Sequence, residues 1–293
     1  MSRKQNAIIL AAGFSSRFAP LSYEKPKALV EVKGEILIER QIRQLLEAGI
    51  QDITLIVGYK KEMFDYLRGK FGVEIIENTE YATKNNLSSI YAAKMKLKNT
   101  YVCSADNYFT ENVFIEDPKE AYYSAEYAEG KTEEWCISFD EKDFITKVTI
   151  GGENSYYMIG HAYFSEAFTQ EFLKILEVTY PKKEAGSMLW EHMYIRHLEQ
   201  LPMKIKKFEK NIINEFDSLS ELKEFDGSYK SNTRSDILKS IAKKLEVSED
   251  QIETIIPLNT MGVISGFSFK VKNRPYEYLY EQQELRSVES SES

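Results

Sequence analysis

The sequence is poor in residues that build cross-links and metal sites. Its 293 residues include only two cysteines, Cys103 and Cys136, and three histidines. Two cysteines exclude a disulfide framework and a four-thiolate metal site, and such low usage is typical of proteins from a reducing compartment. We therefore expect a cytoplasmic protein.

Long apolar runs and an excess of positive charge are also missing. The N-terminal run Ala7 to Ala12 is far shorter than the roughly 20 apolar residues of a membrane span, and it continues into a polar loop instead of a signal-peptide cleavage site. Lys and Arg total 38 against 46 Asp and Glu, a net charge of -8. We expect no membrane insertion and no nucleic-acid partner, because nonspecific binding of a polyanion requires a basic face.

What the chain does have, in its first half, is an alternation of short apolar runs and amphipathic segments. Apolar runs lie at 7–12, 53–57, 74–76 and 101–105, and helical spacing of apolar residues occurs at 36–48, 61–70 and 88–97. Strands that alternate with helices of this length specify a parallel sheet with right-handed crossovers. The expected fold class is therefore α/β, with a mostly parallel central sheet.

The middle of the chain favours strands over helices. Aromatic and β-branched residues dominate 122–127, 134–139, 145–150 and 157–164, and Glu129-Gly130 and Gly151-Gly152 suggest turns between them. We interpret this region as an antiparallel extension that walls a cleft beside the sheet. Helices are expected again at 166–179 and 189–198, and a last strand at 203–208.

A polar segment without periodicity, Asp226 to Asn232, marks a domain boundary. We expect one domain over residues 1–227 and a small C-terminal α+β appendage over residues 228–293, with a helix at 236–246 capped by Ser235 and two strands around the turn at 272–275. About 60 residues is marginal for an independent core. A chain that ends near Gly227 is expected to remain active, because the appendage supplies none of the candidate ligands.

The strongest local motif runs from Leu10 to Pro20 and continues into Lys25-Pro-Lys27. A strand that ends in a loop of small residues exposes successive backbone N–H groups, which suit the oxygens of a triphosphate. Arg17 and Lys27 would supply positive charge. The alternative is an ordinary strand-to-loop turn with surface cations, since neither a Walker loop nor G-x-G-x-x-G is present.

A second motif, Ser104-Ala-Asp106-Asn107, follows the fourth strand. Ligands of open α/β sheets bind at the carboxyl ends of the strands, and Mg²⁺ prefers one or two carboxylates together with phosphate oxygens. Asp217, after the last expected strand, offers the second carboxylate. A turn-forming or capping role for Asp106 is equally open at this point.

These residues together resemble a known family. The run from Ala7 to Phe109, with LAAGFSSRFAPLSYEKPKALVEVKG, NNLSSIYAA and SADNYF, is similar to the Rossmann-like sugar-nucleotidyltransferase fold, and within it to the bacterial phosphocholine cytidylyltransferase-like group, which includes phosphonate cytidylyltransferases. The resemblance covers roughly residues 5 to 225. It implies a Mg²⁺-dependent nucleotidyltransferase that uses CTP.

The resemblance also implies roles for individual residues. Lys27, Arg17 and Asp106 would be catalytic, and Asp106 and Asp217 would hold Mg²⁺. The implied nucleotide-binding residues are Leu10, Ala11, Ala12, Gly13, Ser15, Ser16, Arg17, Lys27, Gly58, Tyr59, Asn78, Asn86, Ser88 and Ala105.

The acceptor pocket depends on aromatic and acidic residues. Members of the phosphocholine type hold a quaternary ammonium with aromatic faces and acids, as cation–π interactions favour. The candidates here are Asp106, Trp135, His161, Tyr163, Trp190 and Glu215. His161 departs from the choline-type pattern and could donate a hydrogen bond to a phosphonate oxygen, although a histidine satisfied within the core is the alternative.

We therefore expect a cytidylyltransferase that transfers CMP from CTP to a small aminoalkyl phosphonate, with 2-aminoethylphosphonate as the first choice. Phosphocholine is the second candidate acceptor, a sugar 1-phosphate is the third, and a nucleotide-binding module without turnover is the rival from another class. Residues 237–271 resemble the start of a choline-kinase-type N-lobe, so a further enzyme domain after residue 293 is a possible partner.

Overall fold

The computed structural model describes residues 4–114, 117–260 and 263–288. The chain forms two compact units, one of residues 1–13 and 37–215 and the other of residues 14–36 and 216–293. Each unit is therefore built from segments that lie far apart in the sequence. Within the described ranges, no helix is long and apolar enough to cross a membrane.

The first unit is organised around a mixed sheet. In the described residues its strand order is β10-β8-β9-β6-β1-β4-β5. β1, β4, β5 and β6 run parallel to their neighbours in this group, whereas β9 pairs antiparallel with both β6 and β8. The expected α/β class with an antiparallel extension is confirmed. The strands are β1 (Asn6–Ala11), β4 (Ile53–Val57), β5 (Glu74–Glu77), β6 (Thr100–Ser104), β8 (Tyr122–Phe139), β9 (Ile145–Phe164) and β10 (Lys204–Lys207).

Helices link and cover these strands. The residues of β1 and β4 are almost all buried, as the continuous apolar runs predict for strands covered on both faces. The predicted helix 166–179 is confirmed at both ends, and Ser165 accepts a hydrogen bond from Phe168 N as its N-cap. The helices are α2 (Leu37–Glu47), α3 (Tyr66–Phe71), α4 (Leu87–Ala92), α5 (Glu166–Thr179) and α6 (Trp190–Ile195), with short 3₁₀ turns η3 (Lys61–Phe64), η4 (Lys94–Lys96) and η5 (Lys183–Ser187).

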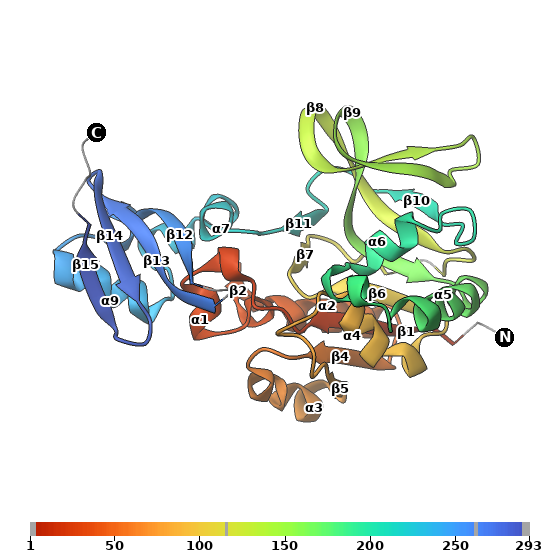
Figure 1. Cartoon of the computed structure of the whole chain (residues 1–293), viewed down its shortest axis with the longest axis horizontal. Coiled ribbons are helices and arrows are strands. Elements are labelled where there is room, and N and C mark those ends of the chain that lie inside the picture. The colour runs from red at the N-terminus through yellow and green to blue at the C-terminus, as the bar shows by residue number, and fades with distance from the viewer. Residues whose placement is uncertain (1–3, 115–116, 261–262, 289–293) are drawn as a thin grey trace. The chain divides into compact units, whose positions relative to one another are not determined.

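The two longest strands correct one expectation. Glu129-Gly130 and Gly151-Gly152 do not form turns between separate strands, because β8 and β9 each continue through these residues. Gly130 and Gly151 have positive φ, and the pairing register shifts nearby, so these positions act as irregularities within a paired ribbon. Figure 1 shows both strands as long curved ribbons that extend beyond the rest of the sheet.

A small antiparallel pair completes the first unit. β7 (Asn107–Phe109) follows β6 almost directly and pairs with β11 (Ile213–Glu215), with Asn107 opposite Glu215. This pair was not predicted, since three-residue strands leave no periodic signal.

The second unit contains the C-terminal sheet and the segment that follows the first strand of the chain. Helix α9 (Asp236–Leu245) begins at the predicted cap Ser235, whose Oγ accepts from Leu238 N. The predicted turn at 272–275 joins β13 (Val263–Val271) to β14 (Arg274–Leu279). The other elements are η1 (Ser16–Phe18), α1 (Leu21–Glu24), η2 (Lys27–Leu29), β2 (Glu31–Val32), β3 (Glu35–Ile36), α7 (Leu219–Phe225), α8 (Ser228–Ser231), η6 (Glu249–Gln251), β12 (Glu253–Thr260) and β15 (Glu284–Ser287).

This division of the chain differs from the expected boundary after residue 227. Residues 14–36 lie with residues 216–293, because polar contacts of high sequence separation join them. The pattern of the sequence marks composition shifts but gives no sign of such pairing.

Candidate active site

The loop after β1 begins within the first unit. Leu10 O accepts a hydrogen bond from Ala105 N at 3.1 Å, and Ala12 O accepts from Tyr59 N at 3.1 Å. The backbone after β1 is thereby fixed to the segments that follow β6 and β4. Four of the predicted nucleotide-binding residues are brought together by these two bonds, and Gly13 beside them is exposed.

The predicted cations Arg17 and Lys27 lie in the second unit, and Asp217 brings them together. Arg17 Nη1 is 2.9 Å from Asp217 Oδ2, and Lys27 Nζ is 3.9 Å from Asp217 Oδ1. The Asp217 backbone N–H donates to Glu221 Oε2 at 2.7 Å, and Ser218 caps helix α7. One carboxylate at the start of α7 therefore balances two cations from residues 14–36 (the signature segment).

The Lys27 side chain is 4% exposed, unlike that of Arg17 at 73%. Its Nζ lies 5.6 Å from the centroid of the Phe18 ring, which is itself buried. Lysine is rarely buried to this degree, because removal of an ammonium group from water is costly unless anions compensate it. The buried ammonium of Lys27 in the signature segment is suited to an anionic ligand, since the fold has already removed most of its hydration water.

Asp106 follows β6 in the first unit and is half-buried. The turn that carries it is fixed by Gln41 of α2, whose Nε2 donates to Ser104 O at 2.7 Å and to Asn107 O at 3.0 Å. Asn107 Nδ2 donates in turn to Glu215 Oε2 at 3.4 Å. The predicted acid Asp106 therefore directly precedes β7, whose first residue, Asn107, lies opposite the predicted acid Glu215 of β11.

The predicted nucleotide-binding residues Asn78 and Ser88 belong to a hydrogen-bonded cluster. Asn78 Nδ2 donates to Ser88 Oγ at 2.8 Å and to Ser89 Oγ at 3.0 Å, and all three side chains are buried. A Cβ added to Gly58 would lie 2.5 Å from the Tyr81 ring. These residues are brought together as expected, but the contacts of Asn78 are with protein groups, so its side chain orders the cluster.

Three of the acceptor candidates occupy the core. His161, Tyr163 and Trp190 are 1%, 0% and 2% exposed. Trp135 is half-buried, with its ring 5.1 Å from that of His192, and Glu215 is exposed. His161, Tyr163 and Trp190 therefore pack in the core, which does not support the expectation that they bind the acceptor. Asp106, Trp135 and Glu215 keep accessible surface.

His161 has a full set of protein partners. Its Nε2 lies 2.8 Å from Tyr122 Oη, and its backbone N–H donates to Ser124 Oγ at 2.8 Å. Burial, together with the nearby positive charge of Lys206, lowers the pKa of His161 to about 3. The imidazole is therefore neutral at physiological pH and belongs to the aromatic core, so a hydrogen bond from it to a phosphonate does not follow.

Glu191 is a titratable residue that sequence reasoning missed. Its carboxylate accepts from Asn86 Nδ2 at 3.3 Å and from Tyr123 Oη at 3.4 Å. Desolvation by the surrounding chain raises the pKa of Glu191 to about 7. In the sequence it reads as one of many acids on an amphipathic helix, and only the fold shows that it lies beside the predicted residue Asn86.

A Mg²⁺ ion is implied by the family resemblance, and the donor chemistry agrees with it. Asp106 and Asp217 offer carboxylate oxygens, which Mg²⁺ prefers in combination with phosphate oxygens and water. Within the ranges that the structure describes, no three His, Cys, Asp or Glu residues cluster as a ligand set.

Comparison with known proteins agrees with this geometry. Residues 7–130 match the MobA-like NTP transferase domain. The chain is 36% identical over 232 residues to the 2-aminoethylphosphonate cytidylyltransferase of Lancefieldella rimae, with 78% of this chain and 94% of the relative covered. It is 34% identical over 220 residues to the choline-phosphate cytidylyltransferase of Streptococcus pneumoniae, with 75% and 96% covered.

A solved structure of CTP:phosphocholine cytidylyltransferase from Streptococcus pneumoniae superposes with a TM-score of 0.74 at 34% identity, covering 77% of this chain and 99% of that one. The sheet, the loop after β1 and these matches define a nucleotidyltransferase of Rossmann-like fold. More narrowly, the chain belongs to the bacterial phosphocholine cytidylyltransferase-like family, which includes the phosphonate cytidylyltransferases.

Proposed function

We propose that this protein transfers CMP from CTP to a small acceptor that carries a phosphonate or phosphate and a cationic nitrogen, with release of pyrophosphate. The first acceptor is 2-aminoethylphosphonate, and phosphocholine is the second. The observation that carries the proposal is the pairing of Asp217 with both Arg17 and buried Lys27 of the signature segment. Relatives that span the same three quarters of the chain carry out this class of reaction by name.

In this proposal the acceptor oxygen attacks the α-phosphorus of CTP, and the bond to the β-phosphate oxygen breaks. The acceptor oxygen is already ionised at neutral pH, so the chain need not supply a general base. The main barrier is repulsion between two anions, which positioned cations lower most when charge builds up in the transition state. Lys27 and Arg17 are assigned this role.

Mg²⁺ would be held by Asp106 and Asp217 and would supply further charge neutralisation at the phosphates. Asp217 has a second task, because its carboxylate orients Arg17 and Lys27 before any nucleotide binds. The loop after β1 would contribute backbone N–H groups to the triphosphate, and the hydrogen bonds of Leu10 O and Ala12 O fix the start of that loop.

The acceptor preference follows from which candidate side chains keep exposed surface. A trimethylammonium group is held by several aromatic faces, whereas a primary ammonium has three N–H donors that seek acceptor oxygens. Of the predicted acceptor residues Trp135, Tyr163 and Trp190, Trp135 alone keeps exposed surface, since the other two are buried. Glu191 and Glu215 offer carboxylates, and a bound cation would favour the ionised form of Glu191. The primary amine is therefore placed first.

The deciding experiment is an acceptor panel with CTP and Mg²⁺, assayed by pyrophosphate release. We expect kcat/KM to be highest for 2-aminoethylphosphonate, lower for phosphocholine and phosphoethanolamine, and lowest for a sugar 1-phosphate. Glu191→Gln should raise the KM for the amine acceptor and leave the KM for CTP unchanged. A higher kcat/KM for phosphocholine would reverse the order of acceptors.

Two other outcomes would change the class of function. Turnover of a sugar 1-phosphate with another nucleoside triphosphate would make the protein a sugar nucleotidyltransferase. CTP binding without pyrophosphate release from any acceptor would favour a nucleotide-binding module without turnover.

A further inference from the structure

The segment that carries both candidate phosphate-binding cations is attached to the C-terminal part of the chain. Residues 14–36 and 216–293 form one compact unit. Lys27 lies in this segment between two anchored residues, Glu24 on its N-terminal side and Glu31 on its C-terminal side. Each anchor has partners beyond residue 227, in the region that the sequence suggests is an appendage.

Glu24, the last residue of α1, is bound to the N-terminus of α9. Its Oε1 accepts from Ser235 Oγ at 2.7 Å and from Ile237 N at 2.9 Å, and its Oε2 accepts from Asp236 N at 3.2 Å. A carboxylate here satisfies N–H groups that have no partner within the helix and interacts favourably with the helix dipole. Next to it, the rings of Tyr23 and Tyr280 stack at 3.7 Å.

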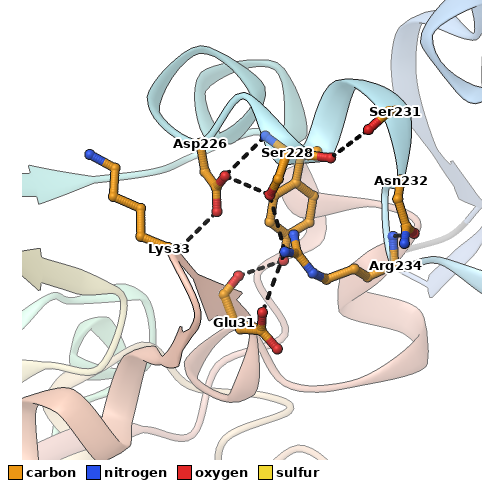
Figure 2. A network of polar contacts seen from close by, with 8 residues as sticks. Glu31, Lys33, Asp226, Ser228, Ser231, Asn232 and Arg234 are labelled. Atoms are coloured by element: carbon orange, nitrogen blue, oxygen red, sulfur yellow. Dashed lines mark hydrogen bonds and ion pairs between the residues drawn. The ribbon is translucent and has the colours of Figure 1, made fainter.

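Glu31 is held by a second set of contacts, drawn in Figure 2. The hydroxyl of buried Tyr229 donates to Glu31 O at 2.6 Å, and Arg234 Nη2 donates to Glu31 Oε1 at 3.3 Å. The Arg234 guanidinium also lies 4.1 Å from the centroid of the Tyr229 ring. Two side chains of the C-terminal region therefore fix the backbone and the carboxylate of one residue.

Asp226 extends the network to the end of the segment. Its Oδ2 accepts from Lys33 N at 2.7 Å, and its Oδ1 accepts from Ser228 N at 3.0 Å and from Ser228 Oγ at 2.6 Å. As Figure 2 shows, Lys33 and Glu31 approach from the signature segment, whereas Asp226, Ser228 and Arg234 come from the C-terminal chain.

We propose that the described part of the C-terminal region, residues 228–260 and 263–288, forms a clamp that positions Lys27, with Glu24 and Tyr229 as positioning residues that touch no substrate. The inference rests on the proposed function, because Lys27 is assigned to the phosphates there. A flexible ammonium gains catalytic value when the backbone that carries it is fixed before the reaction. The clamp fixes this backbone through the contacts of Glu24 on the N-terminal side of η2 and of Glu31 on its C-terminal side.

Full-length Tyr229→Phe and Glu24→Gln test the clamp, with Tyr276→Phe as the matched control. Tyr276 lies on β14 and its described ring contact is with Phe269. Hydrogen–deuterium exchange should become faster in residues 14–36 of both test variants and remain unchanged in the control. Both test variants should lose about threefold to tenfold in kcat, as expected for one lost hydrogen bond, with the KM for CTP nearly unchanged.

A double-mutant cycle separates positioning from loss of stability. In a Lys27→Met background, Tyr229→Phe should lower the residual rate no further, because the residue that it positions is gone. Unchanged exchange in residues 14–36, or the same fold loss of rate in both backgrounds, would overturn the clamp. Failure of the wild-type protein to use CTP would instead overturn the proposed function, since the exchange measurement requires no turnover.

Discussion

At the scale of single residues, Lys27 is the side chain on which the proposed chemistry depends most. Lys27→Met should lower kcat by about 10²-fold to 10³-fold, the usual cost of losing one group that stabilises transition-state charge. CTP should still bind measurably, because ground-state binding uses other contacts as well. Steady-state kinetics and calorimetric titration of CTP measure the two effects.

Lys25→Met is the matched control, since Lys25 lies on the same segment and has no assigned role. It should keep kcat within about twofold of wild type. If Lys27→Met changed only the KM for CTP, Lys27 would be a ground-state contact alone.

The two acids assigned to Mg²⁺ should respond differently to substitution. Asp106→Asn removes a charge from the metal alone, so we expect kcat to fall roughly 10²-fold and the Mg²⁺ concentration for half-maximal rate to rise. Asp217→Asn also removes the partner of Arg17 and Lys27 and should affect CTP binding in addition. A Mg²⁺ titration of each variant distinguishes them, and an unchanged Mg²⁺ requirement in Asp106→Asn would remove that residue from the metal.

His161 predicts a pH dependence of stability. The pKa of His161 is lowered to about 3 by burial and by the charge of Lys206, whereas an unfolded histidine titrates near 6.5. Between these values the unfolded state binds a proton that the native state does not. The free energy of unfolding should therefore decrease as the pH falls below about 6.5, with a slope that approaches about 1.4 kcal/mol per pH unit.

Chemical denaturation of wild type and His161→Gln between pH 4 and 7 checks this expectation. The variant should be less stable at pH 7 but should lose the contribution of this residue to the slope. Equal slopes in the two proteins would show that His161 is protonated in the native state.

How far the sequence predicts the site differs from residue to residue. Loop chemistry and family resemblance predict Arg17, Lys27 and Asp217, and the structure brings them together. The prediction of His161, Tyr163 and Trp190 rests on the ability of aromatic residues and histidine to bind ligands, but the same residue types fill cores. Hydrophobic periodicity and composition do not distinguish an aromatic residue that binds a ligand from one that packs in the core. The position of Glu191 in the sequence likewise does not reveal that its carboxyl group is desolvated.

At the scale of elements, the hairpin of β8 and β9 depends on glycines of two kinds. Gly130 and Gly160 have φ of 74° and 84°. A Cβ at Gly160 would lie 2.9 Å from Ile213 Cγ2 and 3.2 Å from Ser124 Oγ, whereas one at Gly130 would meet no described atom within 4 Å. The two positions therefore separate backbone strain from crowding.

Gly130→Ala should cost about 1–2 kcal/mol of unfolding free energy, the penalty of a left-handed alanine. Gly160→Ala should cost a further 1–3 kcal/mol or so, because the added methyl group crowds β11. Thermal and denaturant unfolding of the pair measure the difference. Equal losses would show that β9 relaxes enough to accommodate the methyl group.

The elements themselves were predicted best where one periodicity dominates. Strand β4 and helix α5 agree with the expected ranges at both ends, since each has a continuous apolar run or a capped amphipathic pattern. The sequence pattern divides the ribbon of β8 and β9 into four strands, because a glycine in a turn and a glycine in a bulge look the same in the sequence.

At the scale of the whole molecule, the contacts between residues 14–36 and the C-terminal region argue against the expectation that a chain ending near Gly227 remains active. Such a chain lacks the partners of Glu24 and the hydroxyl bonded to Glu31 O. We expect it to lose turnover and to expose residues 14–36 to protease, because these residues would lose their contacts with Tyr229, Arg234 and the N-terminus of α9. Limited proteolysis and pyrophosphate release from the truncated and full chains test this prediction.

Full activity of the truncated chain would show that the C-terminal region is dispensable. The sequence suggested that outcome because the polar segment at 226–232 resembles a linker, and contacts between residues about two hundred positions apart leave no local pattern.

The sequence distance between the signature segment and its anchors also has a consequence for biosynthesis. Glu24 and Ser235 are 211 positions apart. At 5–20 residues per second, the ribosome therefore adds Ser235 roughly 10–40 s after Glu24. During that interval the segment that carries Lys27 is present on the nascent chain without its anchors. The clamp can close only after translation has passed α9, so a prematurely terminated polypeptide would carry the signature segment without the contacts that order it.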